Sequence, residues 1–547
     1  MKPPAQDPLL GPDGDDVQVS SPSPGNQNET TIDVDPEDRE HLIGGANDER
    51  FGLYTCAFYS TFDGGRTWGE LFFPIPAGHD FAGDPGTAMG PAGEAYFSAI
   101  AADRNYTFSS LYVGRSFDGG RTVPSWVQAV GSPPGGFQDK QLIVTDLSSS
   151  PLRGTLYMAW TRIANSYTTH TIHVVTSFDQ GATWTTPVRV SESQVSTAAA
   201  PAVGPNGELY VAWLDYSTSK LQVDVSHDGG LTFGTDVDVA SVALISGIPN
   251  GSFRANSNPS LGVDISGGPF DGNVYVCWGN NQGTHTDVLF SRSTDGGVTW
   301  SPPLVVNDDG TSRSQWFPWL DVDPNGNVNI GFYDRREDVN DRRIGFWVAR
   351  SSDGGVSFQP NVRVAEQTFD PSTYPNGSLI GDYNGLAASD RTVHAMWADG
   401  RNATNDTFTS RVQLAFYGDT DTLSAASGGR VGFTINPGPL YAGASYFVLA
   451  SISGTSPGYT FSNGLELPLN LDAFTQLGLQ LANTPVLPSF IGTLDGTGSA
   501  TAALDTLGPI ANPAAVGLQL SFAVLVTGPG ASPWAWASEP FGVTILP

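Results

Sequence analysis

Carboxyl, phenol and amine side chains stand at one equivalent position of a repeated sequence unit. Aligning the units on their first predicted strand selects Glu29, Asp84, Lys140, Ala198, Asn258, Phe317 and Tyr383, and Asp139 and Asp382 come one residue earlier. Ionisable residues that differ between repeats are the informative ones, since a residue that every repeat keeps is explained by the scaffold. Carboxyl groups at such positions can act as general acid and base, and a tyrosine can act as a nucleophile.

Arginines and recurring aspartates occur in the loops near these positions. Arg254 and Arg313 precede the first strands of two units, and Arg335 and Arg401 follow the second strands of two others. Arginines that converge in a chain of net charge −30 are expected either to pair with local acids or to bind an anionic ligand such as a carboxylated sugar, which a guanidinium binds bidentately. The expected substrate-binding set also contains Lys140, Trp316 and Asp382. An aspartate ends the second strand of most units, at 48, 103, 215, 334 and 399, and we interpret it as a loop cap or ion-pair partner.

The units are defined by an octapeptide that occurs six times. Its copies are TFDGGRTW (61–68), SFDGGRTV (116–123), SFDQGATW (177–184), SHDGGLTF (226–233), STDGGVTW (293–300) and SSDGGVSF (351–358). Alternating apolar runs flank each copy, which predicts a strand, a tight turn and another strand: Gly supplies positive φ, and Asp with Ser or Thr caps the turn. A calcium-binding loop would require more acidic oxygen atoms than one Asp offers.

Two further strand signals lie between successive copies, so each unit has the four strands of a propeller blade. Counting first-and-second-strand pairs gives seven units, because 386–397 opens a last one, whose expected third strand is 411–418 and which lacks a fourth. The segment 16–21 matches the fourth strands of other units. We predict that it completes the seventh blade and closes the ring, with the aligned residues at the mouth of the central channel and the octapeptides on the opposite face.

The pattern S-x-D-x-G-x-T-W resembles the Asp box of bacterial neuraminidase repeats, and residues 15–418 are similar to a secreted Asp-box propeller related to the sialidases. The resemblance implies a Tyr nucleophile assisted by a Glu, an Asp acid/base and three arginines that hold a substrate carboxylate. It makes Tyr383, which opens the last unit, the candidate nucleophile, with Glu29 assisting it and Asp84 or Asp139 as the acid/base. Arg254, Arg313, Arg335 and Arg401 are the candidates for the carboxylate grip.

The remaining segments differ in composition. Residues 419–547 contain one Arg and no Lys and alternate like strands, and they resemble a small C-terminal β-sandwich of secreted bacterial proteins with a role in attachment, secretion or stability. Trp534 and Trp536 in this segment fit either its core or a sugar-stacking surface. Residues 1–14 are expected to form a disordered leader.

Bulk properties exclude several classes of partner. The pI of about 4.3 and the net charge of −30 argue against nucleic acid and anionic membranes, and no apolar run is long enough to cross a membrane. Cys56 and Cys277 lie in apolar strand-like runs and are expected to be packed thiols. We expect no cofactor and no bound metal.

The sequence thus predicts an all-β, secreted or cell-surface protein with a seven-bladed propeller and a C-terminal sandwich. Its expected function is that of a sialidase-like exo-glycosidase on an acidic or complex glycan. The main alternative is a non-catalytic propeller that binds glycan or protein, with the C-terminal domain contacting cell-surface or matrix components. A polysaccharide lyase that uses His170 or His173 is a third hypothesis.

Overall fold

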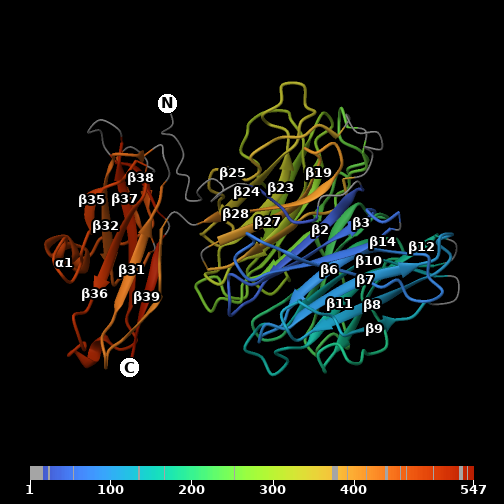
Figure 1. Cartoon of the computed structure of the whole chain (residues 1–547), viewed down its shortest axis with the longest axis horizontal. Coiled ribbons are helices and arrows are strands. Elements are labelled where there is room, and N and C mark those ends of the chain that lie inside the picture. Colours follow the sequence, from blue (N-terminus) through green and yellow to red (C-terminus); the bar gives the residue numbers. More distant parts are fainter. Residues whose placement is uncertain are drawn as a thin grey trace. The chain divides into compact units, whose positions relative to one another are not determined.

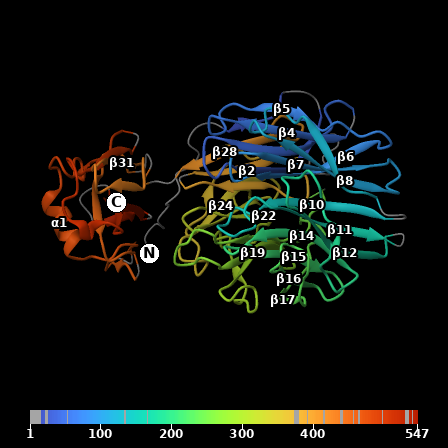
Figure 2. The same cartoon turned by 90° about the horizontal axis from the view of Figure 1, so that it is seen from below.

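The computed structural model describes residues 16–547 except 22–24, 53, 133–135, 165–166, 252, 372–379, 391, 414–415, 438–440, 456, 463–464, 497, 529–533 and 539. The expected leader at 1–14 lies outside the described residues. The rest divides into two compact units, one up to Arg411 and one from Val412 (Figures 1 and 2). Among these residues, no helix is both long and apolar enough to cross a bilayer.

The unit up to Arg411 contains seven four-stranded antiparallel sheets, which are the blades of a propeller. Blade 1 contains β2 (Gln27–Val34), β3 (Leu42–Asp48), β4 (Thr55–Thr61) and β5 (Gly69–Phe72), and blade 2 contains β6 (Phe81–Met89), β7 (Ala95–Ala102), β8 (Ser109–Ser116) and β9 (Ser125–Val130). Blade 3 contains β10 (Phe137–Thr145), β11 (Leu156–Ala164), β12 (Thr169–Ser177) and β13 (Val188–Arg189), and blade 4 contains β14 (Ser196–Val203), β15 (Leu209–Asp215), β16 (Lys220–Ser226) and β17 (Val237–Ser241). Blade 5 contains β18 (Ser260–Val263), β19 (Val274–Asn281), β20 (Thr286–Ser293) and β21 (Leu304–Val305), and blade 6 contains β22 (Gln315–Val322), β23 (Val328–Asp334), β24 (Gly345–Ser351) and β25 (Val362–Arg363). Blade 7 contains β26 (Gly385–Ala388), β27 (Thr392–Asp399), β28 (Asp406–Gln413) and β1 (Val17–Gln18).

The first strands of successive blades contact one another around the ring, for example β10 and β14, which lie side by side in Figure 2. The ring closes where β26 contacts β2, and β1 supplies the fourth strand of blade 7 by pairing antiparallel with β28. The predicted ring closure by the N-terminal strand is therefore confirmed. The third strand of blade 7 is Asp406–Gln413, earlier than the expected 411–418. Phe416–Gly418 instead forms β29, which belongs to the unit from Val412 and pairs there with Arg430–Ile435.

An ion-pair triad fastens β1 to its blade. Arg401 donates to Asp16 at 2.6 Å and to Asp399 at 2.7 Å, and both carboxylates are buried. The guanidinium also lies 4.3 Å above the ring centre of Phe408, on β28. The strand that closes the ring is thus held by charge as well as by backbone pairing.

Each middle strand packs against two neighbouring blades, which explains why these strands are apolar on both faces. On β11, Met158 and Trp160 join a core with residues of blade 2, and Tyr157 and Ala159 join a core with residues of blade 4. The buried thiols of Cys56 and Cys277 belong to such cores and are not linked, which confirms the prediction of packed thiols.

The six octapeptides form one kind of turn between the third and fourth strands. In blade 5, Ser293 Oγ donates to Asp295 Oδ1 at 2.8 Å, Thr299 donates to the same carboxylate through N and Oγ1, and Gly297 N donates to Ser293 Oγ. The hydrogen bonds from Thr299 and Ser293 lower the pKa of Asp295 to about 2. The other five copies repeat these four contacts.

The unit from Val412 is a β-sandwich. One sheet contains β29 (Phe416–Gly418), β31 (Arg430–Ile435) and β36 (Ala500–Asp505). The other contains β30 (Thr422–Ser424), β39 (Phe541–Leu546), β37 (Gln519–Thr527), β32 (Ser445–Ser451), β35 (Ile491–Thr493) and β38 (Trp534–Ala537), and β33 (Tyr459–Thr460), β34 (Glu466–Leu467) and α1 (Ala473–Leu481) lie outside both sheets. Side chains of the two sheets share one core, in which Trp536 is fully buried, so the sugar-stacking interpretation is wrong for Trp536. Trp534 packs against Phe447 and Phe461.

Candidate functional site

The aligned channel positions share an unusual backbone conformation. Glu29, Asp84, Lys140, Ala198 and Phe317 have φ between 49° and 62°, and each lies where the pairing of the first and second strands shifts register. A non-glycine residue in this region is uncommon, and a β-bulge redirects the side chain it carries. The equivalence inferred from the sequence is thus a real structural equivalence in these five blades.

Asp382 lies between two cations from different blades. Arg254, which precedes blade 5, binds it bidentately at 2.8 and 2.7 Å, and Lys140 of blade 3 also donates to it. Burial would raise the pKa of Asp382, but Lys140 and Arg254 outweigh burial and lower it. The three residues link blade 3, blade 7 and the loop before blade 5 across the channel mouth.

A second carboxyl pair lies beside this ion pair. Glu29 is 3% exposed, and Asn47 Nδ2 donates to its Oε2 at 2.8 Å, while Asp84 N donates to Asn47 Oδ1 at 2.8 Å. Burial, the charge of Asp84 and a hydrogen bond with Asp84 raise the pKa of Glu29 well above its usual range. Sequence reasoning missed Asn47, because nothing distinguishes this amide on a second strand before its partners are seen.

Asp139 is the third carboxyl group with an altered proton affinity. It is partly exposed, and burial raises its pKa to about 6, against the opposing charge of Lys140. We call the six residues Glu29, Asp84, Asp139, Lys140, Arg254 and Asp382 the channel cluster. Four carboxyl groups face two cations in the channel cluster, and burial together with the charge of Asp84 favours the protonated form of Glu29.

Tyr383 lies against the channel cluster and is 8% exposed. Its hydroxyl donates to Pro85 O at 3.1 Å, and its ring packs on Trp319 at a centroid distance of 5.8 Å. Burial, followed by the charges of Glu29 and Asp84, raises the pKa of the phenol well above its usual range. The hydroxyl therefore carries its proton at neutral pH.

The other predicted binding residues make their contacts elsewhere. Arg335 is 1% exposed, donates to the carbonyl oxygens of Pro249 and Asp341 at 2.8 Å each, and lies 5.1 Å from the ring centre of the fully buried Trp316. Arg401 belongs to the triad that holds β1. The role of these three residues in ligand binding stays a prediction.

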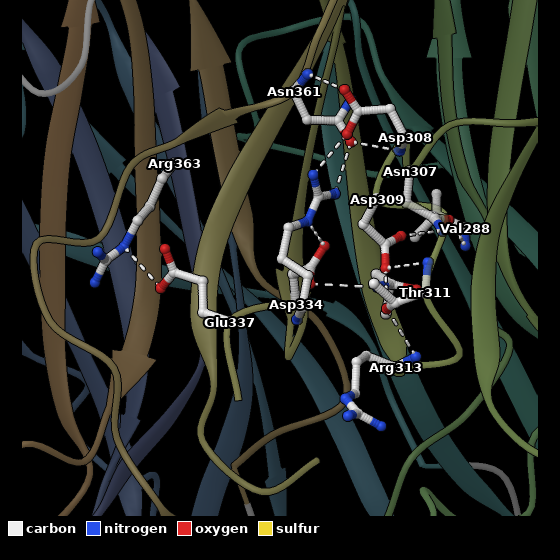
Figure 3. Close-up of polar contacts among 12 residues, drawn as sticks. Val288, Asn307, Asp308, Asp309, Thr311, Arg313, Asp334, Glu337, Asn361 and Arg363 are labelled. Atoms are coloured by element: carbon white, nitrogen blue, oxygen red, sulfur yellow. Dashed lines mark hydrogen bonds and ion pairs between the residues drawn. The ribbon is translucent and has the colours of Figure 1, made fainter. Parts of the chain in front are cut away.

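Arg313 lies in a polar network of blades 5 and 6. It donates to Val339 O at 2.8 Å. Figure 3 shows its guanidinium directed away from Asp308, Asp334 and Asn361. A different arginine, Arg336, donates to all three of these residues. Of the four arginines proposed for the carboxylate grip, Arg254 is the one whose contacts lie in the channel cluster.

The aspartates that end the second strands serve their loops, as interpreted from their recurrence. Asp334 binds the backbone and guanidinium of Arg336, and Asp48 and Asp399 bind Arg50 and Arg401 in the same way. Asp103 and Asp215 accept hydrogen bonds from backbone groups of the loops that follow them.

Three other features bear on the choice of site. A hollow of about 400 Å³ lies between the first two octapeptides and is lined by Phe62, Asp63, Glu70 and Arg121, away from the channel cluster. We place the site at the channel cluster, because the groups with altered pKa lie there.

His173 is buried, and burial lowers its pKa to about 3, which does not suit a lyase base acting on substrate. The described part of the chain contains no group of three or more acidic, His or Cys residues that could hold a metal ion.

No family model and no curated protein matches the chain. Solved structures show a likeness in fold. They include the α-L-arabinofuranosidase Arb93A of Fusarium graminearum (13% identity, TM-score 0.43, 74% of this chain and 99% of that one) and the Hadza microbial sialidase Hz136 (14%, 0.41, 66% and 74%). A Penicillium chrysogenum α-L-arabinanase, solved with arabinobiose, is also similar (12%, 0.41, 74% and 98%). This likeness assigns no activity to the propeller, whose activity has to be argued from its own residues.

Proposed function

We propose that the propeller is a glycoside hydrolase whose reacting bond lies over the channel cluster. The observation that carries the proposal is that neighbouring carboxyl groups have diverging pKa values: burial raises that of Asp139 to about 6, whereas two cations lower that of Asp382. Glycoside hydrolysis requires a protonated acid beside ionised groups, and carboxyl groups with diverging pKa values supply that pair.

The residues fit a double-displacement reaction. Asp139 donates its proton to the glycosidic oxygen while Tyr383 Oη bonds to the anomeric carbon and the glycosidic C–O bond breaks. Glu29 and Asp84 share a hydrogen bond, and this pair accepts the proton of the phenol. In the second half, ionised Asp139 takes a proton from water, whose oxygen bonds to the anomeric carbon as Tyr383 leaves and regains its proton.

The charges of the site favour a neutral sugar at the reacting position. Arg254 is bound bidentately by Asp382, and Lys140 contacts the same carboxylate. A carboxylated sugar would have to share the Arg254 guanidinium with Asp382 and would face the other carboxyl groups of the channel cluster. We therefore favour a neutral glycan over the acidic one expected from the sequence.

A panel of 4-methylumbelliferyl glycosides, neutral and sialylated, tests the proposal. The wild-type chain should release the fluorophore from at least one neutral sugar, and Asp139→Asn should lower kcat/KM about 100-fold or more. Because Asp139 acts as a protonated acid, kcat/KM should fall as the pH rises through about 6. The matched control is Asp228→Asn in an octapeptide turn, which should keep the activity. Release from no sugar would contradict the proposal, and release from the sialoside alone would contradict the preference for neutral sugars.

A second candidate is a non-catalytic propeller that binds glycan or protein at the channel face. The ion pairs of Asp382 with Lys140 and Arg254 favour it, because a binding or structural surface can neutralise its acids in this way. For either function we propose secretion, with the C-terminal sandwich contacting cell-surface or matrix components.

A further inference from the structure

Five aromatic residues occupy the loops and strand starts of blades 1 to 3 on the channel face. We call them the aromatic track: Tyr54, Phe81, Tyr106, Phe137 and Tyr167. Phe81 and Phe137 open the first strands of blades 2 and 3, and the three tyrosines lie in loops that join second to third strands. Since both kinds of segment lie at the same end of an antiparallel blade, the five residues belong to one face of the propeller.

The members of the aromatic track contact one another in series. Ring centroids are 6.3 Å apart for Tyr54 and Phe81, 5.1 Å for Phe81 and Tyr106, and 5.8 Å for Tyr106 and Phe137. Tyr167 Oη donates to Tyr106 O at 2.5 Å. Four rings therefore form a continuous path from blade 1 to blade 3, and Tyr167 is attached to this path through its hydroxyl.

The outer rings of this path are presented to solvent. Tyr106 and Tyr167 are each 54% exposed, whereas Phe137, which contacts the Tyr106 ring, is 8% exposed. Both tyrosines also have positive φ, 55° and 69°, a region that bulky residues rarely adopt. Such backbone strain persists where the surroundings impose it, and it is concentrated at ligand-binding sites.

The Tyr54 end of the aromatic track lies beside the channel cluster. A Cβ placed on Gly83, the residue before Asp84, would lie 3.0 Å from the Tyr54 ring and 3.3 Å from Oδ1 of Asn47, and Asn47 donates to Glu29. The track thus begins beside the carboxyl groups over which the reacting bond is placed.

Polar groups border the exposed rings. Arg104 donates to Asp80 at 3.0 Å, and Asp103 accepts from the hydroxyl of Thr107, all in or next to the loop that carries Tyr106. A sugar ring has an apolar C–H face and a rim of hydroxyl groups, and it matches aromatic rings edged by charged acceptors and donors.

We propose that the aromatic track binds consecutive sugar residues of an oligosaccharide whose reacting end lies over the channel cluster. The position of the reacting end rests on the proposed function, whereas the binding of the sugars to the track does not require catalysis.

Isothermal titration calorimetry of the full chain with cello-, xylo-, arabino- and chitotetraose tests this inference. At least one tetrasaccharide should bind more tightly than its monosaccharide, and Tyr106→Ala and Tyr167→Ala should each weaken that binding about 10-fold. Tyr106→Phe keeps the ring and should keep the affinity. The matched control is Phe178→Ala, since Phe178 is 53% exposed but belongs to an octapeptide turn on the other face.

The outcomes separate this inference from the proposed function. Binding of no tetrasaccharide, or unchanged binding in both tyrosine variants, would overturn the inference. If a tetrasaccharide binds through the track and the wild type does not hydrolyse it or any glycoside, the inference stands and the proposed function fails. Should Tyr106→Ala melt earlier than the wild type, Tyr106→Leu, which is apolar but lacks a flat ring, gives the same comparison.

Discussion

On the octapeptide face of the propeller, six turns repeat one set of residues and hydrogen bonds, whereas on the channel face equivalent backbone positions carry different side chains. The turns satisfy their own polar groups locally, as Asp295 does with Ser293 and Thr299. At the channel positions, the polar groups find their partners on other blades: Asp382 of blade 7 accepts a hydrogen bond from Lys140 of blade 3.

This difference separates two uses of one repeat. A residue that recurs with the same partners stabilises each blade independently, so its loss affects one blade. A residue that differs between blades can contribute a distinct group to a shared centre, so its loss affects that centre and leaves the blades intact. Substitutions on the two faces should therefore change different measured quantities.

The largest effect is expected at Tyr383. Tyr383→Phe removes the proposed nucleophile, and hydrolysis of the best glycoside should fall at least about 1,000-fold. Its melting temperature should change little, because the variant loses one hydrogen bond, to Pro85 O. Kinetics and thermal melting on the same preparation check both expectations. If the variant loses much stability but keeps its activity per folded molecule, Tyr383 is structural and the channel face is not the site of catalysis.

The next largest effect is expected at Arg401, which lies in the ring closure. Arg401→Ala leaves the buried carboxylates of Asp16 and Asp399 without their cation, and it should reduce the free energy of unfolding by about 3–5 kcal/mol. Urea unfolding followed by tryptophan fluorescence measures this change. A loss below about 1 kcal/mol would show that backbone pairing of β1 alone holds the ring closed.

The smallest effect is expected in an octapeptide turn. Asp295→Ala removes the acceptor of three hydrogen bonds at an exposed turn and should lower stability by about 1–2 kcal/mol, with hydrolysis unchanged. The same unfolding and kinetic measurements apply. Reduced kcat/KM in this variant would mean that the two faces are coupled and that the separation of roles is wrong.

The fold was predictable because its information is repeated. The octapeptides locate six turns, and the unit count of seven with one strand missing predicts that residues 16–21 complete the last blade. The third strand of blade 7 was misplaced because no octapeptide marks its end, so the apolar run into Phe416 looked continuous with it.

The candidate site was predictable only in part. Aligning first strands selects residues that the bulges bring together, such as Glu29, Asp84 and Lys140, because backbone equivalence follows from the repeat. The contacts of long side chains do not follow from it. Arg254 and Arg335 both lie near first or second strands, yet the paths of their loops direct one to Asp382 and the other to Pro249 O.

The pairing of Val17 with Thr409 has a consequence for how this protein is made. A ribosome synthesises β1 long before β28, so the first described strand has no partner until the last blade has emerged. Until then the free edge of β28, and the apolar faces of blades 1 and 7 that meet at the ring closure, are open to wrong pairing. Because this contact spans nearly the whole propeller, its formation is a slow step that cannot be completed during synthesis of the earlier blades.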